Sequence, residues 1–148
     1  MRPIRTRTAP VKRKAMAQPT IERRLERKFI VMTRDEALLA ALRAQLTPEW
    51  ELVPVLDLAA LGEWNDILLY RFLLLDLDET DAFDPIDVIR AIRMEYMLQI
   101  AVFCFGGDRA VRDEMRLARA DRFYERAQIA QMLPKFLRQY SWGAAPAQ

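Results

Sequence analysis

Apolar and polar residues alternate in blocks along residues 28–141, and the blocks predict five strands, each followed by a helix. The strongest block is residues 72–77, where Phe72 and three leucines lead directly into Asp76. A continuous apolar run of this kind predicts a strand buried on both faces, as in a parallel sheet that helices cover. Shorter apolar runs predict the other strands at residues 29–32, 51–55, 100–105 and 122–124.

The segments between these apolar runs are expected to be helices. Apolar residues at helical spacing predict helices at about 35–46, 57–68, 84–96, 108–118 and 126–140. Asp84 followed by Pro85 is a strong helix start, because Asp caps the first turn and proline fits the first helical position. Gly62 weakens the second helix, and Pro134 should kink the last one. Pro54 cannot donate to a sheet ladder, so strand 51–55 is expected at an edge.

Five strand–helix units in succession predict an α/β fold: a five-stranded, parallel, doubly wound sheet in flavodoxin-like order, with helices on both faces. Right-handed crossovers bring the carboxyl end of every strand to one edge, where such folds bind their ligands. An Asp at this edge is where an α/β protein would hold Mg²⁺ or accept a phosphoryl group. The residues expected there are Thr33, Arg34, Asp35, Asp76, Asp78, Cys104 and Arg126.

The composition excludes several kinds of catalytic and metal site. The chain of 148 residues has the length of one domain, and its 52% hydrophobic content is enough for one core. The absence of histidine excludes Ser-His triads and most transition-metal sites. The single cysteine, Cys104, excludes an intrachain disulfide and suits a reducing cytosol, so a cytoplasmic protein is expected. No apolar stretch is long enough to span a bilayer.

Charge divides the chain at about residue 28. Residues 1–28 carry ten basic and two acidic side chains, whereas the remainder carries 13 Lys and Arg against 19 Asp and Glu. We therefore expect a disordered basic arm at residues 1–27, a folded domain at residues 28–141 and a flexible tail at residues 142–148. The arm could contact nucleic acid or an anionic surface, or Met16 could be the true start of the chain.

In element order and spacing, residues 28–140 resemble the receiver domain of bacterial response regulators. In that family a phospho-accepting Asp follows the third strand, and Asp76 stands at that position. The family also has an acidic pair after its first strand. Here the pair falls on Thr33 and Arg34 or, with a slip of one residue, on Arg34 and Asp35.

Two further positions depart from the family's pattern. The Ser or Thr that follows the fourth strand falls on Cys104 or Phe105, and the Lys that follows the fifth falls on Arg126. The missing hydroxyl removes the group that would sense a phosphate. Arg126 keeps the positive charge but replaces a compact ammonium group by a planar fork.

These departures predict a site that has lost its phosphorylation chemistry. Mg²⁺ prefers carboxylate oxygens, and Arg34 would set a fixed positive charge against the ion and could pair directly with Asp76. Without the ion, phosphoryl transfer to Asp76 loses its main electrostatic support. Asp78, Asp35 or Glu36 could support weak Mg²⁺ binding, and no other cofactor is expected. The resemblance thus implies a degenerate, pseudo-receiver-like domain, with a functional receiver phosphorylated on Asp76 as one alternative.

A second alternative is a phosphatase, because part of the chain also resembles the haloacid-dehalogenase family. Asp76 to Thr80 matches that family's DxDxT motif, in which the first Asp is the nucleophile and the second the general acid/base. Gly107, Asp108 and Asp113 match its metal-binding motif. The two motifs lie too close together, however, for the strand and helix that this family places between them.

Arginines on the predicted helix at 108–118 mark a candidate docking surface. Receivers resemble one another in using this helix, the fifth strand and the last helix for output, which implies another signalling or regulatory protein as the partner. A homodimer through the last helix region is a further possibility. The expected function is protein–protein interaction in signal transduction, of the two-component type, rather than catalysis. The docking candidates are Arg109, Arg112, Arg116 and Arg119, spaced along one stripe, and Arg122 in the next strand.

Overall fold

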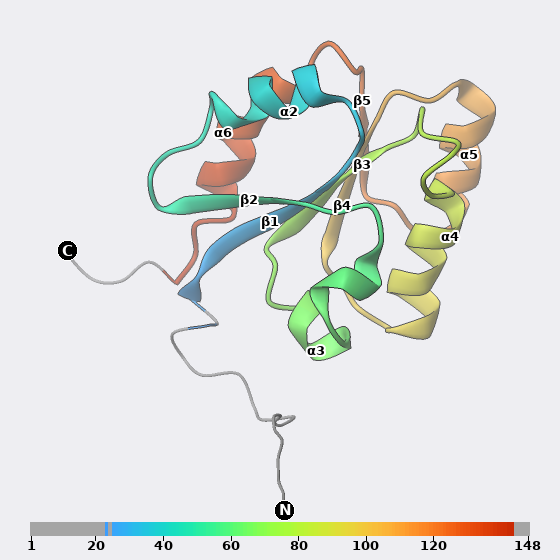
Figure 1. Ribbon diagram of the computed structural model, residues 1–148. Helices are drawn as coiled ribbons and strands as arrows, with labels where there is room; N and C mark the ends of the chain where they lie inside the picture. Colours follow the sequence, from blue (N-terminus) through green and yellow to red (C-terminus); the bar gives the residue numbers. More distant parts are fainter. Residues whose placement is uncertain (1–22, 24, 144–148) are drawn as a thin grey trace, which may run out of the picture.

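The computed structural model describes residue 23 and residues 25–143, so most of the expected basic arm and the end of the tail lie outside the described residues. Five parallel strands form one sheet: β1 (Arg27–Met32), β2 (Trp50–Pro54), β3 (Phe72–Asp76), β4 (Ala101–Phe105) and β5 (Arg122–Tyr124). Their order across the sheet is β2-β1-β3-β4-β5 (Figure 1). The predicted fold class, a parallel doubly wound sheet of flavodoxin-like order, is confirmed.

The position of β2 follows from its proline. Pro54 ends the strand opposite Val31 of β1, and β2 has a neighbour on one side only. The missing N–H of proline is therefore tolerated. The prediction of an edge strand is confirmed, and the two acid-bearing strand ends, those of β1 and β3, lie side by side in the middle of the sheet.

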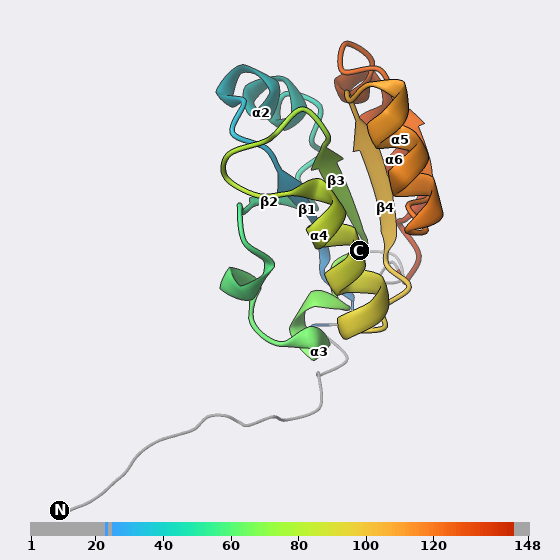
Figure 2. The ribbon, with the colours of Figure 1, turned by 90° about the vertical axis from the view of Figure 1, so that its right-hand side faces the viewer.

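Helices cover both faces of the sheet, as Figure 1 and Figure 2 show. One face packs against α2 (Glu36–Arg43) and α6 (Ile129–Gln139). The opposite face packs against η3 (Leu58–Leu61), α3 (Trp64–Ile67), α4 (Pro85–Arg90), η4 (Ala91–Glu95) and α5 (Arg109–Leu117). No helix in the described part of the chain is long and apolar enough to cross a membrane.

The two faces of the sheet are packed differently. Toward α2 and α6 the side chains are largely aromatic: the ring centroids of Phe29 and Phe72 are 4.7 Å apart, and those of Phe103 and Phe136 are 4.4 Å apart. The opposite face is mainly aliphatic, with Leu73 among its buried side chains. Every residue of β3 is buried, which agrees with a strand covered on both faces.

The continuous helix predicted over residues 57–68 is wrong. Asp57 does cap a helical turn, but the segment breaks into η3 and α3, each a single turn. The break lies at Gly62, whose φ of 116° is in a region that glycine adopts readily and other residues avoid. The segment consequently buries Leu58 and Ile67 but leaves other apolar side chains outside the core.

Two other helices also differ from their predicted ranges. Asp84 and Pro85 start α4 as expected, but regular α-helix ends at Arg90 and a π-helical turn, η4, follows. The last helix begins at Ile129 rather than at residue 126 and continues past Pro134 to Gln139. Arg126 therefore lies in the loop between β5 and α6, where its side chain can reach back over the edge of the sheet.

Candidate functional site

The carboxyl edge of the sheet gathers polar side chains from three strand ends. Thr33 and Asp35 follow β1, Asp76 ends β3 with Asp78 two residues later, and Arg126 follows β5. Parallel strands place these residues at one edge, and hydrogen bonds between their side chains join them into one cluster. Asp76 and Arg126 are at its centre.

Both carboxylate oxygens of Asp76 are fully used. Oδ1 accepts from the backbone N–H of Asp78 at 2.9 Å and from Nη1 of Arg126 at 2.8 Å. Oδ2 accepts from the Thr33 hydroxyl at 2.7 Å and from Nη2 of Arg126 at 3.1 Å. The residue is only 3% exposed. Two donors on each oxygen occupy its lone pairs, so Asp76 is held as a buried, paired carboxylate.

Arg126 bridges three carboxylates. Besides Asp76, it donates from Nη1 to Asp78 at 3.0 Å and from Nη2 to Asp35 at 2.8 Å. These contacts raise the pKa of Arg126, mainly through the hydrogen bond to Asp76, and the bond from Arg126 is the main cause that lowers the pKa of Asp35. The guanidinium also lies over the ring of Phe105, 5.3 Å from its centroid. Arg126 thus supplies a permanent positive charge at the centre of the site.

A divalent cation does not fit this arrangement. Mg²⁺ needs oxygen ligands at about 2.0–2.1 Å in near-octahedral geometry. The carboxylates of Asp35, Asp76 and Asp78 instead face the guanidinium of Arg126, which stands between them and would repel the ion. Across the residues that the structure describes, no group of three or more His, Cys, Asp and Glu side chains could hold a metal.

Arg34 does not pair with Asp76, contrary to the sequence interpretation. Its Nε donates to Glu79 at 3.0 Å and its Nη2 to Asp81 at 3.3 Å. Glu79 is only 7% exposed and also accepts from the backbone N–H groups of Asp81 and Ala82, each at 2.8 Å. These hydrogen bonds, with that from Ala82 first, lower the pKa of Glu79 from 4.5 to about 2. Sequence reasoning missed Glu79, which the sequence presents only as one acid among several in a loop.

Cys104 is not part of the cluster. It is fully buried in the aliphatic core, and this burial raises the pKa of its thiol to about 12. The residue level with Asp76 in the sheet is Phe105, which offers a ring instead of a hydroxyl. The hydroxyl that contacts Asp76 comes from Thr33, which directly follows the other neighbouring strand, β1.

Asp78 connects Arg126 to the turn that follows β4. Its Oδ1 accepts from the backbone N–H of Gly107 at 2.9 Å, while Oδ2 accepts from Arg126. Gly106 and Gly107 have φ values of 75° and 76°, and a Cβ on Gly106 would clash with the Asp78 carboxylate. The two glycines therefore make the room in which Asp78 reaches Arg126.

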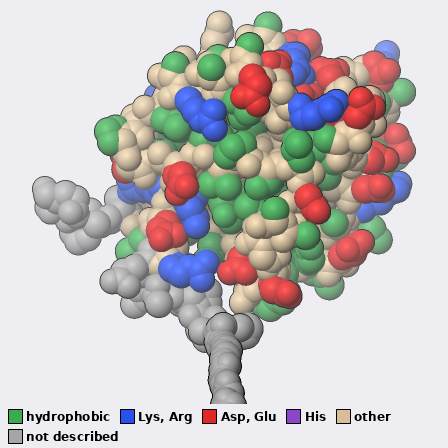
Figure 3. Space-filling view, in the orientation of Figure 1, with side chains coloured by type: hydrophobic (Ala, Val, Ile, Leu, Met, Phe, Trp, Pro, Cys, Tyr) green, Lys and Arg blue, Asp and Glu red, His purple; other side chains and the backbone are tan. Residues whose placement is uncertain are grey.

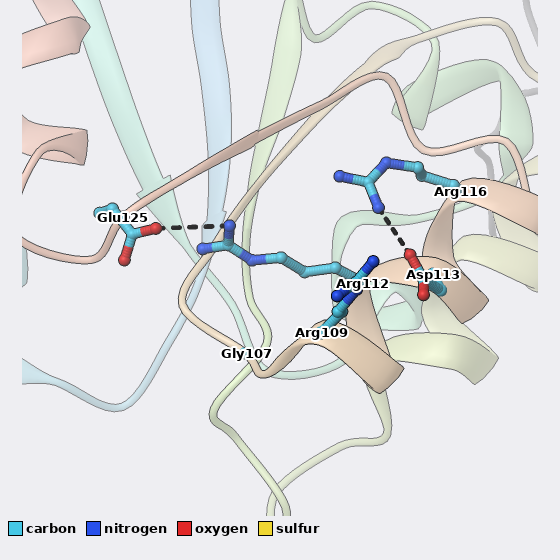
Figure 4. A pocket seen from close by; sticks show the side chains of 6 residues that line it. All are labelled: Gly107, Arg109, Arg112, Asp113, Arg116 and Glu125. Atoms are coloured by element: carbon cyan, nitrogen blue, oxygen red, sulfur yellow. Dashed lines mark hydrogen bonds and ion pairs between the residues drawn. The ribbon is translucent and has the colours of Figure 1, made fainter.

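The arginines of α5 line a cavity of about 480 Å³, which Figure 4 shows. Arg112 mainly stabilises the fold, because its guanidinium donates hydrogen bonds to the carbonyl oxygens of Gly106 and Tyr124. Arg116 pairs with Asp113 at 2.8 Å. The residues that line the cavity are Gly107, Arg109, Arg112, Asp113, Arg116 and Glu125.

The predicted stripe of arginines is shorter than expected. Arg119 lies beyond the end of α5 and has a φ of 75°, so it leaves the helical spacing, and its side chain donates to the carbonyl oxygen of Arg93 at 3.3 Å. Arg109, Arg116 and Arg122 are exposed, as is Arg119 in the turn between α5 and β5. The first three are the exposed arginines that lie on α5 and β5 themselves.

The residues of the phosphatase alternative make other contacts. Asp108 caps α5 by accepting from the backbone N–H of Val111 at 2.9 Å, and Asp113 pairs with Arg116. Asp76 and Asp78, the expected nucleophile and general acid/base, both accept hydrogen bonds from Arg126. The geometry therefore gives this alternative no assembled site.

Two buried arginines far from this edge were not predicted. Each serves the fold by donating hydrogen bonds to several backbone carbonyls. Arg71 donates to the carbonyl oxygens of Leu25, Glu26, Tyr140 and Trp142. Arg93 donates to those of Leu98, Ile100 and Arg119 and pairs with Asp121 at 2.8 Å.

Solved structures of response regulators match this fold over most of the chain. The phosphorylated cyanobacterial phytochrome response regulator RcpA matches with a TM-score of 0.64 and 18% identity, over 82% of this chain and 99% of its own. The signal receiver domain of a response regulator from Bermanella marisrubri matches with a TM-score of 0.60 and 21% identity, over 76% and 96%. A response regulator in its Mn²⁺-bound form matches with a TM-score of 0.60 and 15% identity, over 82% and 99%.

No protein family model matches the sequence, and no curated protein matches it either. The predicted receiver-like fold is confirmed by the structural matches. At identities this low the likeness establishes the fold, and the work of the site has to be argued from the side chains of this chain.

Proposed function

We propose that this protein is a degenerate receiver-like signalling module, which works by binding another signalling protein and does not require phosphorylation. One observation carries the proposal: the guanidinium of Arg126 stands among Asp35, Asp76 and Asp78 and pairs with all three. A receiver that is switched by phosphorylation needs a cation it can bind and an Asp it can modify. In this protein the positive charge at that place is the side chain of Arg126.

The pairing works against phosphoryl transfer in two ways. An attacking carboxylate oxygen needs an available lone pair, and each oxygen of Asp76 already accepts two hydrogen bonds. Transfer also needs a metal ion to neutralise the charge that develops on the phosphoryl group, and Arg126 keeps such an ion out. Opening the site would break charged hydrogen bonds to a buried carboxylate, which costs about 1.5–3 kcal/mol each.

A permanently paired site fixes the conformation of the domain. In a switchable protein, a ligand or modification shifts the balance between two states. Arg126 is charged at every physiological pH, so its ion pairs hold one arrangement of the loops after β1, β3 and β5. The surface near these loops is then presented constantly, as a docking module requires.

The arginine surface formed by Arg109, Arg116 and Arg122 is the docking face that we assign. It carries three exposed arginines, of which Arg116 pairs with Asp113, beside a cavity of about 480 Å³ that Asp113 and Glu125 also line. A positive surface steers negatively charged partners and favours them over others. The partner is therefore a signalling or regulatory protein with an acidic surface.

Phosphorylation is tested by incubating the full chain with acetyl phosphate and Mg²⁺ and measuring its intact mass. The proposal predicts no phosphoryl adduct, and a stoichiometric adduct that Asp76→Asn removes would refute it. A receiver with an intact site, treated in parallel, shows that the reagent works.

Docking is tested by crosslinking and capture in cells with matched variants. A specific partner should be lost by the double variant Arg109→Glu and Arg116→Glu, and it should be captured equally well by wild-type protein with and without acetyl phosphate treatment. Arg43→Glu, on the exposed side of α2, is the control for an unspecific effect of charge and should retain the partner. Capture of the partner only after acetyl phosphate treatment would instead favour a working phosphorylation site.

A further inference from the structure

Three apolar side chains on the segment that connects β2 to β3 lie outside the core. Leu56 is 39% exposed, Trp64 53% and Leu68 42%. Trp64 and Leu68 are four residues apart on α3 and its C-cap, so their side chains lie on the same side of the turn.

The same segment is strongly acidic. Residues 55–71 carry three acids, Asp57, Glu63 and Asp66, and their one basic residue, Arg71, is buried. In Figure 3, the lower part of the surface, where Figure 1 places α3, carries carboxylates and hydrophobic side chains together with some Lys and Arg side chains. We call this the α3 surface; it consists of Trp64 and Leu68 with the acids Glu63 and Asp66, all on α3 or its caps.

A basic residue of the chain's own N-terminal part already lies on this surface. The guanidinium of Arg23 is 3.4 Å from the carboxylate of Asp66 in α3. Residues 1–22 precede Arg23 and contain six Lys and Arg against one acid, Glu22. They also contain the apolar residues Met16 and Ile21, which precede Arg23 in the sequence by seven and two positions.

We propose that residues 1–22 dock on the α3 surface of the same chain. Their basic side chains pair with the acids of this surface, and their few apolar side chains cover Trp64 and Leu68. The tether makes the contact efficient, since a short linker holds the segment at an effective concentration in the millimolar range. Fully extended, 22 residues reach about 70 Å, so distance sets no limit. This contact does not depend on how Asp76 works.

Docking can be measured on the full chain by paramagnetic relaxation. A Thr8→Cys variant carries a nitroxide label, while Cys104 stays unlabelled because it is fully buried. We expect the label to weaken the indole N–H signal of Trp64 strongly. The signal should recover in about 1 M NaCl, where the Debye length falls to about 3 Å and exposed charges no longer attract one another.

The decisive control keeps the length of the N-terminal segment unchanged and reverses part of its positive charge. The triple variant Lys12→Glu, Arg13→Glu and Lys14→Glu has the same length, so the indole signal of Trp64 should recover in it. Adding Glu63→Lys, at the N-cap of α3, to the triple variant should restore part of the weakening. Equal weakening in the wild type and the triple variant would overturn the proposal, because it would reflect the tether alone.

A second control separates docking within one chain from docking between two. Labelled protein without ¹⁵N is mixed with unlabelled ¹⁵N protein, so that only contacts between chains can weaken the Trp64 signal. The proposal predicts no effect in the mixture. Weakening in the mixture equal to that in the singly labelled sample would show that residues 1–22 bind a second copy and would overturn docking within the chain.

Discussion

Replacing Arg126 by alanine should destabilise the protein and at the same time create a site that responds to Mg²⁺. The substitution leaves the carboxylates of Asp35, Asp76 and Asp78 facing one another without a counter-ion. Breaking a buried ion pair by removing one partner costs about 3–5 kcal/mol. Arg126 is 34% exposed on its side chain, and Asp35 and Asp78 are 34% and 50% exposed, so solvent screens part of this loss.

Donors that remain on Asp76 reduce the loss further. The Thr33 hydroxyl and the backbone N–H of Asp78 still stabilise the buried carboxylate after Arg126 is gone. We therefore expect the free energy of unfolding at pH 7 to fall by about 2–3 kcal/mol. If the exposed carboxylates then bind Mg²⁺ with a Kd of about 1 mM, 10 mM Mg²⁺ restores about 1.4 kcal/mol.

The assay is urea unfolding followed by tryptophan fluorescence, in EDTA and in Mg²⁺. Arg116→Ala is the matched control, because its ion pair with Asp113 is more than half exposed on both sides and should matter by less than about 0.5 kcal/mol. Two results would refute the reasoning: an Arg126→Ala variant as stable as the control variant, or a wild type that gains as much stability from Mg²⁺ as the variant does.

Three further predictions concern buried groups. The pKa of Glu79 is about 2 in the folded protein against a usual 4.5. Ionised Glu79 therefore stabilises the fold fully above about pH 4.5, and this contribution is lost as the pH falls toward 2. Glu79→Gln should flatten this part of a plot of the free energy of unfolding against pH. Arg71→Met should lower the free energy of unfolding by about 3 kcal/mol in urea, since several buried carbonyls lose their donor, and a loss below 1 kcal/mol would contradict this. Cys104 should resist a thiol reagent in the native protein and react only in urea; fast native labelling would argue against its burial.

The arrangement of the sheet was readable from the sequence because it depends on patterns within each segment. The apolar run from Phe72 to Leu75 requires burial on both faces, which only a central strand provides. Pro54 restricts its strand to an edge. These signals are local in the chain, so they survive without knowledge of any long-range contact.

The break at Gly62 shows where a local pattern failed. Apolar spacing over residues 57–68 is compatible with one helix, and glycine in a helix costs only about 1 kcal/mol relative to alanine. The chain instead uses Gly62 at a φ of 116° and starts a second turn with its own cap. The two conformations differ too little in local free energy for the sequence pattern to choose between them.

The partners within the site could not be read from the sequence for a different reason. Arg34 and Arg126 both lie near Asp76 at the edge of the sheet, and their order in the chain does not say which one pairs with it. Arg126 can do so because α6 begins only at Ile129 and leaves it on a loop. Arg34 turns instead toward Glu79. Long side chains choose partners by loop geometry, which local patterns do not specify.

The central claim is that Arg126 has replaced the phosphorylation switch by a permanent ion-pair cluster. Its most direct test is a titration of the full chain with Mg²⁺ and beryllofluoride, a stable mimic of an aspartyl phosphate, followed by backbone NMR. The account predicts that the amide signals of Asp76, Phe105 and Arg126 stay where they are. Saturable shifts that centre on Asp76 and spread to Phe105 and Arg126 would show a working receiver and contradict it.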